Sequence, residues 1–171
     1  MGSEDTCFES FVSREQAGLL RLAVLLAGDR GHAEDLVQTA LLRTYRHWDR
    51  VAGRGDPTAY VRRAVVTAHT SWRRRLSTGE QVVESVPDRA GPADERDGDE
   101  ELRAALRTLP PRMRAAVVLR YYADLSEQQA AQAMGCSASA VNTQTTRGLA
   151  RLRALLTAPV PVPGEGSRWT T

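Results

Sequence analysis

The sequence predicts an all-α protein made of two small helical domains joined by an acidic, flexible linker, with a helix-turn-helix in the C-terminal domain. Its apolar residues are mostly Ala, Leu and Val, and no long alternating run of Val, Ile and Thr indicates a sheet. Apolar residues recur at helical spacing in both halves of the chain. Between the halves lies a stretch rich in acidic residues, Pro and Gly, which is a composition typical of a linker.

Charge and composition divide the chain into four segments. Every basic residue is arginine, and arginines outnumber Asp and Glu in residues 7–76 and 101–157, whereas acids predominate in 77–100. We therefore expect a first domain at 7–76, an acidic linker at 77–100 and a second domain at 101–157. Residues 158–171 are rich in Pro and Gly and are predicted to form a disordered tail.

The first domain is predicted to contain three helices. The first begins near Phe8 and ends at Gly28, where glycine interrupts the apolar pattern. The second covers His32–Trp48 and is followed by a glycine-rich loop, Val51–Pro57. Because proline is favoured at the first position of a helix, the third helix is expected to open at Pro57 and to run to about Arg75.

The third helix is expected to turn Tyr60, Val61 and Val65 inward and to leave several arginines outside. Trp72 lies among the arginines at its end, and a Trp beside Arg has the composition needed to stack unpaired bases and hold their phosphates. Alternatively, Trp72 is a core residue and the arginines form a solvated helix end that the helix dipole favours. The residues alone leave both interpretations open.

The helix-turn-helix is predicted from its caps and its turn. Ser126 caps a first helix, and Gln129 three residues later completes a capping box. Gly135 lies where the chain must leave that helix with a positive φ, which costs glycine little. Ser137 or Ser139 then caps a second helix.

The second helix of this motif has one apolar and one polar face. Its buried stripe is predicted from helical spacing to contain Val141, Gly148, Leu152 and Leu155. Its other face carries Asn142, Thr143, Thr146, Arg147 and Arg151. Such side chains bond to bases or phosphates when a recognition helix enters the major groove. The alternative is an ordinary helical hairpin with a solvated polar face.

Composition also argues against several classes of protein. No apolar run is long enough to span a bilayer, and the polar, acidic first residues do not resemble a signal peptide, so a cytoplasmic setting fits best. Cys7 and Cys136 are far apart and lack neighbours at metal-ligand spacing, so neither a disulfide nor a zinc site is expected. The sequence contains no catalytic Ser/His/Asp set and no phosphate-binding glycine loop, and we expect neither an enzyme nor a cofactor. The scattered histidines are interpreted as surface or partly buried residues: His32, His47 and His69.

Four motifs, in this order along the chain, resemble those of bacterial sigma-70 factors. Ala33–Tyr45 resembles their polymerase-binding helix, and Pro57–Arg63 with Trp72–Arg75 resembles the helix that melts and reads the −10 promoter element. Leu109–Tyr121 and Leu125–Ser137 resemble the domain that binds the −35 element. The layout is similar to the extracytoplasmic-function (ECF) group in its actinobacterial form. The resemblance implies a region 2-like domain at 7–76 and a region 4-like domain at 101–157.

The resemblance also implies roles for individual residues. The residues matching those that bind the clamp coiled coil of the polymerase β′ subunit are Asp35, Leu36, Gln38 and Leu42. The residues facing the melted −10 strand are Arg62, Arg63, Thr67, Trp72 and Arg73. The residues facing the −35 duplex are Ser137, Ser139, Asn142, Thr143, Thr146 and Arg147. The loop Val51–Pro57 corresponds to one that helps to capture a flipped −10 base.

Three positions depart from the family pattern. Thr67 stands where relatives usually have Asn in the −10 helix, and Asn142 stands where a basic residue is common. Thr39 replaces the usual second acid in the polymerase-binding helix. The change at Thr67 predicts an altered base contact, and the change at Asn142 predicts an altered phosphate or base contact. The change at Thr39 predicts a weaker polymerase contact.

The resemblance therefore implies a sigma factor that binds core RNA polymerase, reads −35 duplex and melts −10 DNA. Its expected partners are the β′ clamp and β flap of the polymerase, promoter DNA and, as a further candidate, an anti-sigma factor. The alternative function is a freestanding helix-turn-helix regulator that binds duplex DNA without polymerase. Such regulators usually dimerise to read two half-sites, and no spare apolar stripe for a dimer is obvious here.

Overall fold

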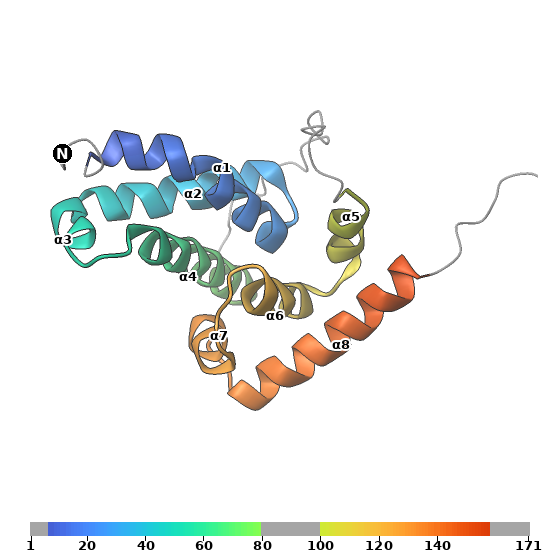
Figure 1. Cartoon of the computed structure of the whole chain (residues 1–171). Helices are drawn as coiled ribbons and strands as arrows, with labels where there is room; N and C mark the ends of the chain where they lie inside the picture. The colour runs from blue at the N-terminus through green and yellow to red at the C-terminus, as the bar shows by residue number, and fades with distance from the viewer. Residues whose placement is uncertain (1–6, 80–99, 158–171) are drawn as a thin grey trace, which may run out of the picture.

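The computed structural model describes residues 7–79 and 100–157, and within these residues it contains helices and no strand (Figure 1). The N-terminal half comprises α1 (Phe8–Ala27), α2 (Arg30–Tyr45), α3 (Trp48–Ala52) and α4 (Pro57–Ser77). The C-terminal half comprises α5 (Glu100–Thr108), α6 (Pro111–Tyr121), α7 (Glu127–Met134) and α8 (Ala138–Leu156). The predicted all-α class is confirmed. Most of the expected linker, and the whole expected tail, lie outside the described residues.

The N-terminal half is built around the contacts of α1, α2 and α4, which lie side by side (Figure 1). The apolar stripe of α1 supplies Phe11, Leu22 and Leu26, all of them at most 1% exposed. They meet the buried valines of α4, of which Val61 and Val65 are fully enclosed. This core fixes the opposite faces of α2 and α4 at the surface.

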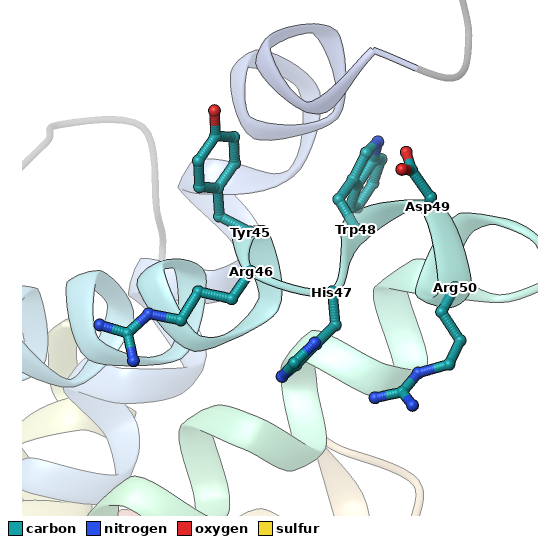
Figure 2. Close-up of a pocket in the computed structure, with 6 residues that line it drawn as sticks. All are labelled: Tyr45, Arg46, His47, Trp48, Asp49 and Arg50. Carbon is teal, nitrogen blue, oxygen red and sulfur yellow. The ribbon is translucent and has the colours of Figure 1, made fainter.

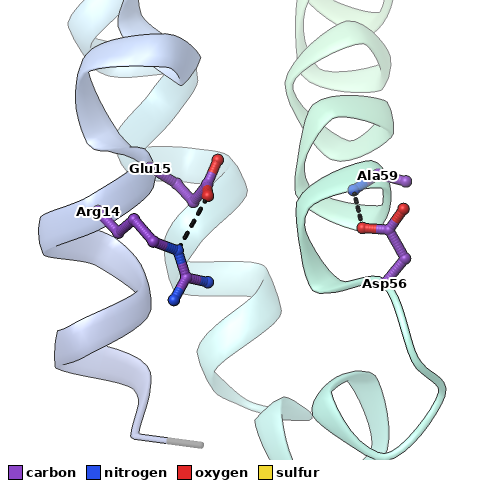
Figure 3. Close-up of polar contacts among 4 residues, drawn as sticks. All are labelled: Arg14, Glu15, Asp56 and Ala59. Atoms are coloured by element: carbon purple, nitrogen blue, oxygen red, sulfur yellow. Dashed lines mark hydrogen bonds and ion pairs between the residues drawn. The ribbon is translucent and has the colours of Figure 1, made fainter. Parts of the chain in front are cut away.

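Two helices of this half, α2 and α4, begin at capping side chains. The Asp29 carboxylate accepts a hydrogen bond from the backbone N–H of His32 at 2.7 Å, at the start of α2. Asp56 does the same for Ala59 at 3.0 Å and so caps α4, directly before Pro57 (Figure 3). Each cap satisfies a backbone donor that the helix itself leaves unpaired. The exposed Arg14–Glu15 pair on α1, also in Figure 3, contributes little by comparison.

Three details of the first domain differ from the prediction. The second helix ends at Tyr45 rather than Trp48, and α3 occupies part of the expected loop, whose remainder is short. The chain turns here because Trp48 is drawn into the core, where its ring lies 5.0 Å from that of Phe11. Tyr60 is 44% exposed instead of inward. It is rotated by about 100° from Val61, on which the buried face of α4 is centred.

The helix-turn-helix forms as predicted. Ser126 and Gln129 make both hydrogen bonds of the capping box, at 3.1 and 2.9 Å. Gly135 adopts the left-handed conformation with φ 64°, and Ser137 rather than Ser139 caps α8. In the stripe of α8, Val141, Gly148 and Leu152 are buried, but Leu155 is 47% exposed. Leu155 lies in the last turn of α8, which extends past α6 (Figure 1).

The two halves pack against each other. Contacts join α1 to α6 and α4 to α7, and α7 lies next to the end of α4 (Figure 1). Buried apolar residues of both halves belong to a single connected cluster. The described residues therefore form a closed arrangement, in which the helix-turn-helix rests on the N-terminal half.

Candidate nucleic-acid interface

The exposed face of α8 brings most of the predicted −35 readers together. Asn142, Thr143, Thr146 and Arg147 are all exposed, and with Ser139 they line a shallow depression of about 350 Å³. The buried stripe holds the opposite side of the helix against α6 and α7. The first turns of α8 thus present a continuous polar surface, as a recognition helix must.

Hydrogen bonds within α8 decide which groups of this surface are available. The Thr143 hydroxyl donates to the Ser139 carbonyl at 3.0 Å, and the Thr146 hydroxyl donates to Oδ1 of Asn142 at 3.2 Å. The outward donors that remain include the amide nitrogen of Asn142, the guanidinium of Arg147 and the exposed hydroxyl of Ser139. The Ser137 oxygen accepts from the backbone N–H of Ala140 at 3.1 Å, so this residue acts in the structure as a cap.

A second polar surface runs along the first half of α4. Arg62, Arg63 and Thr67 are exposed there, on a helix whose other side is buried in the core. The Thr67 hydroxyl donates to the Arg63 carbonyl at 2.8 Å, four residues back. The hydroxyl hydrogen of Thr67 is therefore used within the helix, where an Asn side chain would have brought an amide group.

The end of α4 is more enclosed than its beginning. Trp72 is half-buried, and its ring lies 3.8 Å from that of His32 at 35°, while the His69 ring lies 6.1 Å away. One side of the indole is thus covered by α2, and only part of it is accessible. Arg73 is also half-buried. The structure places these two predicted −10 residues further along α4 than Arg62 and Arg63, with Trp72 against α2 and Arg73 near Arg114 of the C-terminal half.

Burial favours the neutral form of the histidines packed around Trp72. Burial, followed by the neighbouring imidazole of His32 and the positive charges of Arg73 and Arg114, lowers the pKa of His69 to about 3. Burial also lowers the pKa of His32, against the opposing effect of Asp35 and Asp29. Among the described residues, no group hydrogen-bonds Nε2 of His32 or Nδ1 of His69. The sequence predicted surface or partly buried positions for these histidines. In the structure both are more deeply buried, with at most 9% of their surface exposed.

The outer face of α2 contains three of the four predicted polymerase-binding residues. Asp35 and Gln38 are exposed and lie one turn apart, and Leu42 follows on the next turn with 67% of its surface exposed. Leu36, in contrast, is 4% exposed and belongs to the core. It supports this face from beneath and offers little surface to a partner.

The turn between α2 and α3 forms a surface that the sequence analysis did not single out. Tyr45, Arg46, His47, Trp48, Asp49 and Arg50 line an open pocket of about 490 Å³. Figure 2 shows Arg46, His47 and Arg50 on the side of the turn opposite to Tyr45 and Trp48. The sequence signal for this surface was the group of basic residues that follows Tyr45. It was not used because the predicted helix ran on to Trp48, and a continuous helix would point these side chains in different directions.

Other kinds of site find no support in the described residues. Within 7–79 and 100–157, no group of three or more His, Cys, Asp or Glu side chains could hold a metal ion. Cys7 and Cys136, which both lie in this part of the chain, form no disulfide. None of the described helices is long and apolar enough to cross a membrane.

Comparison with known proteins gives the same assignment for both halves. Residues 11–78 match the family profile of sigma-70 region 2, and residues 99–152 match that of sigma-70 region 4. The chain is 39% identical over 148 residues to the RNA polymerase sigma-E factor of Streptomyces avermitilis, covering 85% of this chain and 83% of the relative. It is 38% identical over 155 residues to the corresponding factor of Streptomyces coelicolor, with 88% and 86% covered.

Solved structures of similar fold include two protein complexes. The chain resembles RpoE of Bartonella quintana, solved with the anti-sigma factor NepR, with a TM-score of 0.62 and 22% identity over 90% of this chain and 98% of that one. It resembles CnrH, solved with the cytosolic domain of CnrY, with a TM-score of 0.52 and 21% identity over 90% and 89%. At these identities the likeness concerns the fold.

Proposed function

The chain belongs to the sigma-70 family of RNA polymerase sigma factors, and we propose that it binds core RNA polymerase and directs transcription from promoters of its own class. In this proposal the C-terminal half reads the −35 duplex and the N-terminal half binds the polymerase and opens the −10 element. The domains correspond to 7–76 and 101–157, with an acidic linker at 77–100. Relatives named ECF sigma factors, such as SigE of Mycolicibacterium smegmatis at 29% identity, support placement in the ECF group.

The polar face of α8 is the observation that carries the proposal. Its exposed donors, Asn142 and Arg147, lie on a helix that the core holds outward through Val141 and Leu152. Asparagine pairs well with adenine and arginine with guanine in the major groove, and both groups also bind phosphate. A solvated hairpin would not require this combination of buried stripe, tight turn and donor face.

The remaining surfaces receive roles consistent with this proposal. Asp35, Gln38 and Leu42 form the surface for the β′ clamp coiled coil, and Arg62 and Arg63 hold the phosphates of the opened strand. The β flap and an anti-sigma factor are proposed as further partners; the second is supported by a structure of similar fold that is a complex with the anti-sigma factor NepR. The protein acts on the polymerase in the cytoplasm and has no catalytic chemistry of its own.

Reconstituted transcription tests the proposed function. The purified chain is added to core RNA polymerase with a library of promoter fragments, and the 5′ ends of the transcripts are sequenced. We expect new start sites, each preceded by a shared pair of elements. A freestanding regulator would bind duplex DNA without being captured by the core enzyme, and a wild-type chain that binds DNA but not polymerase would decide for that alternative.

The contribution of Arg147 tests the recognition face directly. If its guanidinium contacts a base, Arg147→Ala should weaken binding to the selected −35 duplex by about 1–3 kcal/mol, with little loss on unrelated sequences. If it contacts only phosphate, all sequences should lose similarly, and the salt slope should fall by about 0.9. Fluorescence anisotropy over a salt series distinguishes these results. Arg153→Ala, an exposed change in the last turn of the same helix, is the control.

A further inference from the structure

A buried arginine ties the two halves of the protein together. Arg114 lies on α6, and only 9% of it is exposed. Its Nε donates to the Leu26 carbonyl at 3.1 Å, and its Nη2 donates to the Ala27 carbonyl at 3.1 Å. Both acceptors belong to the last turn of α1, more than 80 residues earlier in the chain. The guanidinium of one domain therefore caps a helix of the other.

The end of α1 is suited to this role. The last carbonyls of a helix have no partner within the helix, and they form the negative end of its dipole, which favours a cation. Gly28 follows with φ 78°, and a Cβ at this position would lie 3.0 Å from Nη1 of Arg114. Glycine is thus required both by the backbone conformation and by the close approach of the guanidinium.

The contact lacks charge neutralisation. Among the described residues, no carboxylate forms an ion pair with Arg114, and the nearby charge is another cation, Arg73. Burial, and then Arg73, lower the pKa of the Arg114 guanidinium. A buried cation held only by carbonyl groups regains full hydration when the halves separate, which makes this joint easier to open than an apolar one.

The closed arrangement also occupies residues that a bound promoter would use. Arg73 is half-buried at this joint, and a Cβ on Gly135, in the turn of the helix-turn-helix, would lie 3.5 Å from Nη2 of Arg74. One side of the end of α4 thus faces the C-terminal half, whereas Arg74 and Arg75 remain exposed to solvent. Full access of DNA to Arg73 requires the two halves to move apart.

We propose that Arg114 is a latch that keeps the free protein closed and that must release when the chain binds core polymerase and promoter DNA. The latch consists of Arg114, the carbonyls of Leu26 and Ala27, and Gly28. Because only the open fraction of the molecules can bind, the latch weakens the apparent affinity for the polymerase by that fraction. This regulatory step rests on the proposed function, whereas closure of the free protein does not.

The first experiment measures the distance between the halves in the free, full-length chain. Spin labels are attached to Cys7 and to an Ala150→Cys substitution in a Cys136→Ala background, both labelled positions being exposed. We expect one narrow distance distribution, which Arg114→Met should broaden and lengthen because it keeps the apolar stem but removes every donor. Arg112→Met, an exposed change two residues earlier on α6, should leave the distribution unchanged.

A second variant guards against a failure to fold. Gly28→Ala leaves Arg114 intact but places a methyl group where the guanidinium lies, so it should also separate the two halves. Circular dichroism verifies the helical content of each variant. An unchanged distance in folded Arg114→Met or Gly28→Ala protein would overturn the latch.

The second experiment measures binding to core RNA polymerase. Folded latch variants should bind the core several-fold more tightly than the wild type, and Arg112→Met should bind like the wild type. Opening of the variants without tighter binding would overturn the regulatory role of the latch. Absence of polymerase binding by all of the chains would instead overturn the proposed function, and the distance measurement would still decide whether Arg114 closes the free protein.

Discussion

At the scale of single residues, the proposed −10 surface raises the question of what Trp72 does. The sequence left it open whether this Trp stacks on unpaired bases or packs in the core, and the structure gives it features of both. Its ring lies 3.8 Å from that of His32, yet the residue is only half-buried. A single aromatic residue at a domain surface thus joins α4 to α2 and keeps one part available to a partner.

Trp72→Ala should therefore affect both stability and promoter opening. Loss of the contact with His32 should lower the free energy of unfolding by less than the about 3–5 kcal/mol of a fully buried aromatic. Opening of duplex promoter DNA should slow further than this loss explains, because base stacking is worth roughly 1–3 kcal/mol. Fluorescence of a 2-aminopurine in the −10 element measures opening, and a pre-melted bubble should rescue only part of the defect. Trp72→Phe, which retains a ring, is the matched control; an opening defect that follows the unfolded fraction alone would remove the stacking role.

His69 makes stability depend on pH. Its pKa of about 3 lies below the ordinary value near 6.5. Below pH 6.5, His69 therefore becomes protonated in the unfolded chain but stays neutral in the folded protein. Stability contributed by neutral His69 is thus complete above pH 6.5 and is lost as the pH falls towards 3. Relative to His69→Leu, the wild type should lose about 1.4 kcal/mol between pH 7.5 and 5.5. Urea unfolding at both pH values measures the difference, and His47→Leu, at an exposed histidine, is the control; equal pH slopes for the wild type and His69→Leu would contradict the expectation.

At the scale of the helix, much of the fold could be predicted because its signals are local. The capping box of α7, the left-handed Gly135 and the buried positions of α8 follow from residues a few places apart. The break between α2 and α3 could not be predicted in this way. No Gly or Pro marks it, and it arises because Trp48 packs against rings of α1 that are distant in sequence. Contacts of this kind override local periodicity.

Two helical glycines show that the same Gly→Ala substitution can raise or lower the free energy of unfolding, depending on what surrounds the glycine. Gly18 in α1 has open space around the position of a Cβ, whereas a Cβ on Gly148 in α8 would lie 2.7 Å from Cγ2 of Val117. Gly18→Ala should therefore stabilise the protein by about 0.5–1 kcal/mol through helix propensity. Gly148→Ala should destabilise it by about 1–3 kcal/mol, because α6 and α8 must separate. Thermal unfolding of the two variants measures both effects, and a stabilised Gly148→Ala protein would show that this helix crossing is not tight.

At the scale of the whole molecule, the sequence predicted two domains but not how they meet. The faces of α2, α4 and α8 could be assigned because their residue types carry chemistry at helical spacing. The contact of Arg114 with α1 left no such signal, since it joins an arginine to backbone carbonyls, and every residue has a carbonyl. The predicted polymerase face likewise contained Leu36, whose burial only the packing of α1 against α2 decides. Long-range geometry therefore determines which predicted residues are accessible in the closed molecule.

The proposed surfaces for polymerase and for duplex DNA lie in different halves of the molecule, so we expect their defects to be separable. Asp35 and Gln38 lie on α2, exposed and one turn apart, and α2 belongs to a different half from the recognition face of α8. Asp35→Ala with Gln38→Ala should reduce capture of core polymerase, because the double change removes a charge and a hydrogen-bonding amide but no core contact. Binding of the full-length variant to −35 duplex without polymerase should be unchanged.

A matched change on the same helix separates a specific contact from a general loss of charge. Glu34→Ala also removes an exposed carboxylate from α2, but Glu34 forms an ion pair with Arg30 at 3.0 Å and is not one of the predicted polymerase-binding residues. It should cost little, as exposed pairs do. Pull-down with tagged core enzyme and anisotropy with labelled −35 duplex are measured on the same preparations. If the double variant captures polymerase as well as Glu34→Ala does, the outer face of α2 is not the polymerase surface, and Leu42 with the turn at Tyr45–Arg50 becomes the next surface to test.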